Sequence, residues 1–304
     1  MEPATALSDE LEQRMSSSNV PRAIENEITW SWEDWMGITT AHSAEVTPSP
    51  AGAEPAPGFK PEEASALYRE IFDALQVPKR LSGARRLRRG QFEIASEIFP
   101  AQFFSGDFVS VFDSHDKTFL AVGDIAGKGL TAAMWSTHIL GLIRTYSTSL
   151  TEPHRVLHAM NRDLYALGSA PLTTMVLAVL DWRRGELTYS NAGHCAPILH
   201  PRSGTLRQLS EGGPVLGAMY DSQFEAAHVG FGAGDMLVAY SDGLTECKDP
   251  EGEEFGLERL ARQVRSAASL HTSETLFSIV GAVQDFAAGI PRHDDLTLMV
   301  VGSH

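Results

Sequence analysis

The sequence predicts an α+β fold in which antiparallel β-sheets are layered with helices on their outer sides. Short turns such as DSHDK and DWRRG, residues 113–117 and 181–185, separate neighbouring strands, and turns of this length join antiparallel strands. The predicted helices come in pairs between groups of hairpins, and not singly between successive strands. This grouping favours a layered α+β sandwich over a doubly wound parallel sheet.

The first 60 residues differ in composition from the rest of the chain. They carry ten acidic and three basic residues, so −7 of the net charge of −15 falls on them. Residues 25–38 hold three of the five tryptophans, and residues 47–61 form a Pro/Ala/Gly linker. We expect a largely disordered tail. Its tryptophan-rich segment is either a set of isolated aromatic residues or a short docking segment.

Residues 61–90 are predicted to link this tail to the folded part of the chain. Apolar residues at three-to-four spacing over residues 61–78, with Pro61 in the first turn, indicate an amphipathic helix. The sequence KRLSGARRLRRG, residues 79–90, is strongly basic. We interpret it as a solvated connector, with binding of a phosphate or an acidic partner as the alternative.

From Gln91 onward, strands and helices follow one another closely, so we expect residues 91–302 to form the folded domain. Apolar runs bounded by turn residues predict the strands, and apolar positions at helical spacing predict the helices. The predicted strands are 92–98, 107–112, 118–124, 173–181, 186–193, 196–200, 206–209, 223–229, 236–241 and 296–301. The predicted helices are 130–147, 153–167, 256–269 and 273–288.

The composition excludes several classes of function. A net charge of −15 argues against binding nucleic acid or an anionic membrane surface, because both require a basic patch. Cys195 and Cys247 provide neither a disulfide framework nor zinc-ligand spacing. No apolar run approaches the length of about 18 residues that a membrane-spanning helix needs, and the N-terminus lacks the pattern of a signal peptide. We therefore expect a cytoplasmic protein.

Aspartates stand at the ends of apolar strands. Asp107 opens one strand of a predicted hairpin and Asp124 closes the other, at equal distances from the DSHDK turn, so the two carboxylates should face each other. Asp242 ends the strand at 236–241, and Asp294 and Asp295 begin the last strand. Carboxylates that share a site repel each other, and a hard divalent ion such as Mg²⁺ or Mn²⁺ relieves that repulsion. Convergence of the strand ends would therefore create a metal site.

Each of these aspartates has an ordinary alternative as a turn residue, because SDG and GD are common in turns. We infer such a role for Asp235, in GAGDM. The combination is more informative than any single residue, because all the candidate sites share one placement at a strand end.

The stretch VGDIAGKGLTAAM, residues 122–134, also suggests a phosphate-binding loop that would hold a nucleotide. A P-loop requires glycine where Val122 stands, and serine or threonine where Gly129 stands. The sequence therefore disfavours nucleotide binding and makes Asp124 the chemically important residue of this stretch.

Seven short motifs occur in the order found in one family of enzymes. They are GDF, GDIAGKGLTAAM, TTMVLAVLD, YSNAGHCAPIL, GPVLGAM, GDMLVAYSDGLTE and DDLTLMVV. Over about residues 65–302 the chain resembles bacterial PPM-type (protein phosphatase 2C-like) metal-dependent serine/threonine phosphatases, in particular their SpoIIE/RsbU-like branch. The resemblance implies an αββα sandwich of two mainly antiparallel sheets flanked by helices.

The resemblance also implies two divalent cations, Mn²⁺ or Mg²⁺. The implied ligands are Asp107, Asp124, the main-chain carbonyl of Ile125, Asp242, Asp294 and the neighbouring Asp295. The implied reaction is attack of a metal-activated water on phosphoserine or phosphothreonine, which requires no nucleophilic side chain. Eukaryotic relatives carry a histidine where Ala126 stands, so the general acid is left open. Lys128 and His194 are candidates, with a turn or packing role as the alternative for His194.

The biological role implied by the resemblance is dephosphorylation of a signalling protein, an anti-sigma-factor antagonist, in sigma factor regulation. An upstream regulator or a homodimer would act through the helix at 61–78. The alternative hypothesis is a catalytically weak scaffold of the same fold that binds a signalling partner. We interpret Cys247 as a structural thiol, because no base neighbours it in the sequence.

Overall fold

The computed structural model describes residues 69–71, 73–74, 76–101, 104–267 and 270–303. All of them belong to one of the two units into which the chain divides, Phe59–His304. The predictions for residues 1–60, and for most of the helix at 61–78, lie outside the described residues. In the part of the chain that is described, no helix combines the length and apolarity needed to cross a bilayer.

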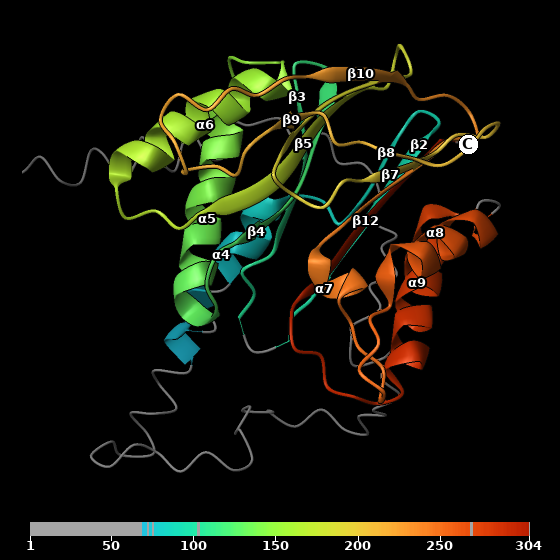
Figure 1. The fold of residues 1–304 in the computed structure, drawn as a ribbon. Helices are drawn as coiled ribbons and strands as arrows, with labels where there is room; N and C mark the ends of the chain where they lie inside the picture. Colours follow the sequence, from blue (N-terminus) through green and yellow to red (C-terminus); the bar gives the residue numbers. More distant parts are fainter. Residues whose placement is uncertain (1–68, 72, 75, 102–103, 268–269, 304) are drawn as a thin grey trace, which may run out of the picture. The chain divides into compact units, whose positions relative to one another are not determined.

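Two mainly antiparallel sheets form the centre of this unit (Figure 1). In order across the first sheet, the strands are β1 (Arg86–Arg89), β2 (Phe92–Phe99), β12 (Leu296–Ser303), β11 (Met236–Tyr240), β7 (Ile198–His200) and β8 (Arg207–Gln208). In the second they are β10 (Ala227–Gly230), β6 (Glu186–Ala192), β5 (Thr173–Asp181), β4 (Lys117–Ile125) and β3 (Phe108–Ser114), with β9 (Gly212–Gly213) paired in parallel with β6.

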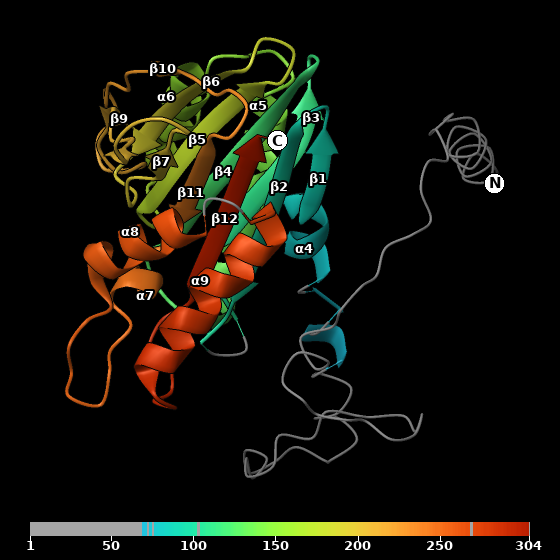
Figure 2. The same ribbon diagram turned by 90° about the vertical axis from the view of Figure 1, so that its right-hand side faces the viewer.

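Helices cover the outer faces of the two sheets. The described helices are α4 (Gln76–Ser82), α5 (Gly129–Tyr146), α6 (Pro153–Leu167), α7 (Asp242–Thr245), α8 (Gly256–Ser266) and α9 (Thr272–Ala287). In Figure 1, α5 and α6 lie on the side of the second sheet, and α8 and α9 lie on the side of the first. Figure 2 shows α9 crossing the outer face of the sheet beside β12. The predicted layered α+β sandwich is therefore confirmed.

The central strands are apolar over most of their length because both of their faces are covered. In β4, Leu120 and Val122 point into the core between the sheets, whereas Phe119 and Ala121 pack under α5 and α6. The same alternation occurs along β12, between the inter-sheet core and the core under α8 and α9. A strand buried on both faces has a continuous apolar sequence, and one exposed on one face has an alternating sequence.

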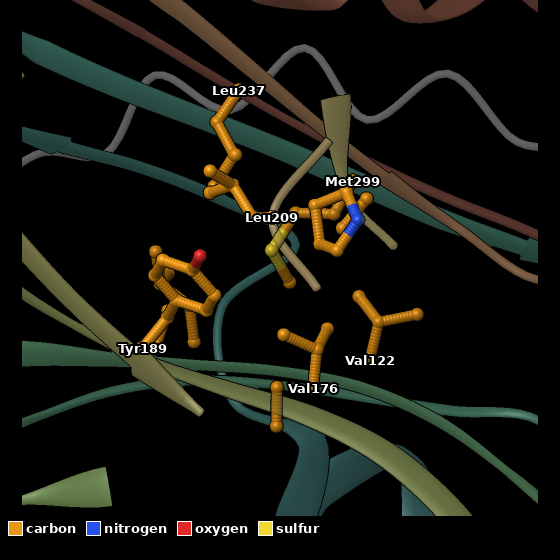
Figure 3. Close-up of a pocket in the computed structure, with 11 residues that line it drawn as sticks. Val122, Val176, Tyr189, Leu209, Leu237 and Met299 are labelled. Atoms are coloured by element: carbon orange, nitrogen blue, oxygen red, sulfur yellow. The ribbon is translucent and has the colours of Figure 1, made fainter. Parts of the chain in front are cut away.

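The inter-sheet core contains a small apolar cavity (Figure 3). Its labelled lining residues are Val122, Val176, Tyr189, Leu209, Leu237 and Met299. None of the predicted site residues lines it. An apolar gap of this kind stays dry, so we interpret it as a packing defect and not as a binding site.

The interpretation of residues 79–90 as a solvated connector is wrong. Helix α4 extends to Ser82, and Arg86–Arg89 form β1, an edge strand paired with β2. Arg89 is hydrogen-bonded to Asp113, and Leu87 packs against the inter-sheet core. Charged side chains are common on edge strands because they discourage pairing with a second molecule. The basic run therefore includes the end of α4 and an edge strand, and two of its arginines, Arg85 and Arg89, pair with the acidic side chains of Glu97 and Asp113.

Strands β9 and β6 are so close at Gly212 that adding one methyl group there should lower the stability of the protein. A Cβ on Gly212 would lie 1.9 Å from the carbonyl oxygen of Asn191, so Gly212→Ala must displace the strand. We expect its free energy of unfolding, measured by urea denaturation, to fall by at least about 2 kcal/mol. Gly230→Ala is the matched control, because a Cβ there meets nothing within 4 Å. Equal stability of the two variants would contradict this packing.

Candidate functional site

The predicted aspartates lie at the ends of paired strands. In the β3–β4 hairpin the register pairs Phe108 with Gly123, so Asp107 and Asp124 come next at the open end. The hairpin prediction is confirmed. In the other sheet, Tyr240 at the end of β11 pairs with Leu298 of β12. Asp242 therefore follows β11 at the end of the sheet where β12 begins.

A hydrogen bond joins the two sheets at this end. The hydroxyl of Thr297, in β12, donates to Oδ2 of Asp107, just before β3, at 2.5 Å. Asp107 is only 6% exposed. Its carboxylate therefore lies between the two sheets, and the ends that carry the acidic residues are held together directly.

The turn that carries Asp242 rests on the main chain before β12. The Ser241 hydroxyl donates to the carbonyl of Asp295 at 3.3 Å and accepts a hydrogen bond from the amide of Thr297 at 3.0 Å. A Cβ on Gly243 would lie 2.0 Å from the same Asp295 carbonyl oxygen. Glycine is required here because the two segments touch, and this contact keeps Asp242 beside the Asp294–Asp295 pair.

Asp294 and Asp295 make different contacts. Both oxygens of Asp295 accept main-chain hydrogen bonds, from Ala101 at 2.8 Å and Gly106 at 3.0 Å, and so fix the chain that enters β3. Asp294 is more exposed, and the ammonium of Lys128 donates to its Oδ2 at 3.2 Å. Asp295 is therefore an anchor for the neighbouring loop, whereas Asp294 lies at the rim of the site.

These carboxylates form one electrostatic group. Burial raises the pKa of Asp107 to about 8, against hydrogen bonds from Thr297 and Ser241 that lower it. Burial, followed by the charge of Asp242, raises the pKa of Asp124 to about 6. Asp294 and Asp295 also raise the pKa of Asp124. The ionised forms of these carboxylates are therefore unfavourable without a counter-charge. A bound cation would stabilise the ionised forms.

The available ligand atoms suit a hard divalent cation. A Cβ built on Gly106 would lie 3.1 Å from the carbonyl oxygen of Ile125, 3.2 Å from Oδ1 of Asp124 and 3.4 Å from the carbonyl oxygen of Gly127. Main-chain and carboxylate oxygens thus converge on the space that the absent side chain of residue 106 leaves open. An all-oxygen set is what Mg²⁺ and Mn²⁺ prefer.

Side chains alone do not complete a metal site in this arrangement. Among the described residues, no three His, Cys, Asp or Glu side chains gather closely enough to hold an ion. Thr297, Lys128 and main-chain amides each bond a different carboxylate of the site. The residues therefore fit a divalent cation in type and location, with main-chain oxygens among the donors.

His194 is buried, with only 9% of its surface exposed, and its Nδ1 lies 2.9 Å from the hydroxyl of Thr174. Burial lowers the pKa of His194 to about 4, so the ring is neutral at pH 7. A neutral imidazole in this setting does not readily deliver a proton, which favours the packing role of His194 over a role as general acid.

Lys128, the other candidate general acid, is exposed at the rim of the site, where its ammonium donates to Asp294 and to the carbonyl of His293.

The two thiols are poor nucleophiles. Burial, followed by the charge of Asp242, raises the pKa of Cys195 to about 11. Burial also raises the pKa of Cys247, which packs against the core under α8 and α9.

Asp235 has the predicted turn role, because its carboxylate accepts hydrogen bonds from the amides of Arg202 and Gly232, both at 2.8 Å.

The sequence reasoning missed the hydroxyl residues of the site. Thr297 and Thr174 contact Asp107 and His194 respectively, and both are inside strands that are otherwise apolar. A hydroxyl in such a strand is the available signal, because a buried hydroxyl needs a hydrogen-bond partner.

The sequence and the fold of this chain are similar to those of known proteins. A profile of the family described as Stage II sporulation protein E (SpoIIE) matches residues 114–304, more than half of the chain. Phosphoserine phosphatase RsbU of Bacillus subtilis (strain 168) is 27% identical over 236 residues, which cover 76% of this chain and 69% of that protein.

Two solved structures show the same fold. The SiaA-PP2C domain of Pseudomonas aeruginosa superposes with a TM-score of 0.67 at 17% identity, over 79% of this chain and 98% of that domain. RsbX in complex with magnesium gives a TM-score of 0.55 at 16% identity, over 72% of this chain and 98% of that chain.

The buried His194 predicts a specific dependence of stability on pH. Its pKa is about 4 in the folded chain and about 6.5 when unfolded, so between these values only the unfolded state binds the proton. Its contribution to stability is present above pH 6.5 and is lost as the pH falls toward 4. We expect wild-type protein to lose on the order of 2–3 kcal/mol more than His194→Gln across this window. The free energy of unfolding of each protein is measured by urea denaturation at several pH values from 7 to 4. The same pH dependence in both proteins would contradict a buried, neutral His194.

Proposed function

This chain belongs to the family of stage II sporulation protein E (SpoIIE), and from that membership we propose how its own residues carry out the reaction. The chain is a phosphoprotein phosphatase that hydrolyses phosphoserine or phosphothreonine on a signalling protein. One observation carries the proposal for its site. Asp124, in a strand of one sheet, lies close enough to Asp242, Asp294 and Asp295, beside strands of the other sheet, for their charges to raise its pKa.

Phosphatases of this fold are metal-dependent, and RsbX has been solved with magnesium. We propose that two divalent cations, Mn²⁺ or Mg²⁺, bind here. The proposed ligands are Asp107, Asp124, the Ile125 carbonyl, Asp242, Asp294 and Asp295. When bound, such cations lower the pKa of a coordinated water and offset the charge of the phosphoryl oxygens.

The chain's other residues orient these ligands and shape the entrance. Thr297 fixes Asp107 between the sheets, and Asp295 fixes the loop that leads to it. Lys128 places an ammonium group at the rim beside Asp294, where a phosphate dianion would approach. We keep Lys128 as the candidate general acid, because it is exposed at the site and carries a proton.

The substrate that we propose is a phosphorylated anti-sigma-factor antagonist. RsbU, the similar protein from Bacillus subtilis, is a phosphoserine phosphatase, and it aligns with most of the catalytic domain proposed for residues 91–302. Control through the segment at 61–78, by a regulator or a second copy of the chain, and a cytoplasmic location stay predictions from the sequence.

Replacing the coupled carboxylates tests the proposed site. We expect Asp124→Asn and Asp242→Asn to lower Mn²⁺-dependent hydrolysis of p-nitrophenyl phosphate by at least about 100-fold, the scale for loss of one electrostatic group in an active site. Their melting temperatures should be equal to or above wild type, because a buried repulsion is relieved. Asp235→Asn is the control, because it removes a turn carboxylate and should leave the rate unchanged. Full activity of both site variants would refute the proposal. If the wild-type protein binds a phosphoprotein without metal and does not hydrolyse it, the scaffold hypothesis is favoured.

The space beside Gly106 gives a second test. A methyl group there would press on Asp124 Oδ1 and the Ile125 carbonyl, so Gly106→Ala should raise the Mn²⁺ concentration needed for half-maximal activity by about 10-fold or more. Gly141→Ala, a position in α5 where a Cβ meets nothing within 4 Å, should keep the wild-type requirement. The same metal requirement in both variants would show that the cation does not use these two oxygens.

A further inference from the structure

His194 lies where the chain crosses from one sheet to the other. It follows β6, in the second sheet, and precedes β7, in the first. The side chain of Asn191 holds its main chain from both sides, accepting from the His194 amide at 2.7 Å and donating to the His194 carbonyl at 3.0 Å. Gly193 permits the turn with φ of 68°. The imidazole therefore occupies a defined place and does not sample a flexible loop.

One nitrogen of the ring contacts the second sheet next to a proposed ligand. Nδ1 lies 2.9 Å from the Thr174 hydroxyl. Thr174 is the direct cross-strand partner of Asp124 on the adjacent strand β4. Directly paired residues point to the same face of a sheet, with their Cβ atoms about 5 Å apart. The contact with Thr174 therefore fixes the imidazole relative to the end of the strand that carries Asp124.

The ring also lies beside the first sheet. Nε2 is buried and has no hydrogen-bond partner among the described residues, and the ring is close enough to the main chain of Tyr240 for that group to raise the pKa of His194 against the effect of burial. Tyr240 is the last residue of β11, two positions before Asp242. The neighbouring Cys195 is close enough to Asp242 and Asp107 to feel their charges. The imidazole thus reaches the strand ends on both sides of the site.

We propose that His194 is a positioning residue that spans the two sheets between Thr174 and Tyr240 and fixes the separation of Asp124 from Asp242. The inference rests on the proposed function, since the separation matters because these carboxylates would share bound cations. Outer contacts of this kind set the spacing of metal ligands, and their loss lowers metal affinity by about 10–100-fold. His194 makes no contact with the substrate in this role.

The test is Mn²⁺ binding to the full-length protein, measured by isothermal titration calorimetry without substrate. We expect His194→Leu, which removes both ring nitrogens, and Thr174→Val, which removes the partner of Nδ1, each to weaken Mn²⁺ binding by about 10-fold or more. The double variant should be no more than about 2-fold weaker than the worse single variant, because both changes break one connection. His194→Gln, which keeps a polar side chain, should recover part of the affinity.

His200→Leu is the matched control. His200 also has a buried Nδ1 without a partner among the described residues, but it lies in β7 and is not a proposed ligand or positioning residue. We expect it to change the melting temperature while Mn²⁺ affinity stays within about 2-fold of wild type. At saturating Mn²⁺, kcat of His200→Leu for p-nitrophenyl phosphate should also stay within about 3-fold of wild type, because this residue has no role at the site.

Each outcome distinguishes the two proposals. Wild-type Mn²⁺ affinity in both His194→Leu and Thr174→Val would overturn the positioning role. If His194→Leu does not fold, Thr174→Val decides the question alone. Failure of the wild-type protein itself to bind Mn²⁺ or to hydrolyse the phosphate ester would refute the proposed function and this inference with it.

Discussion

Repulsion among carboxylates that meet at one end of two facing sheets is the constraint on which the rest of the site depends. Asp107 is buried between the sheets, and Asp124 feels the charges of Asp242, Asp294 and Asp295. The surrounding residues offset this repulsion without removing it. Thr297 donates to Asp107, main-chain amides donate to Asp295, and Lys128 donates to Asp294. A bound cation of the kind that we propose would relieve this unfavourable charge.

The sandwich architecture explains how residues far apart in the sequence reach that place. β12, the last strand, lies between β2 and β11, and its Thr297 contacts Asp107 at a distance of 190 residues along the chain. Gly243 lets the Asp242 turn touch the main chain of Asp295, and Gly106 leaves space in front of the Asp124 and Ile125 oxygens. In these motifs glycine matters because neighbouring segments approach too closely for a side chain.

Sequence reasoning succeeded where a local rule determines the geometry. The placement of Asp107 opposite Asp124 follows from turn length and the two-residue period of a strand, and the register confirms it. Strand β1, in the other sheet, was missed because RLRR has no apolar run. This strand is stabilised by pairing with β2 and by the packing of Leu87 against the core. The order of strands across the sheets, and the contacts of Thr297 and Thr174, depend on long-range packing that periodicity does not encode. The number of layers was expected from the family resemblance and not from the residues alone.

We propose that strand-end oxygens of both sheets bind the same cations, and anomalous X-ray scattering from crystals grown with Mn²⁺ would locate those ions. We expect manganese peaks about 2–2.3 Å from carboxylate oxygens of Asp124 and Asp242, with the Ile125 carbonyl as a further ligand. Manganese peaks only at other places on the protein, with Asp124 and Asp242 bonded to protein groups alone, would contradict it.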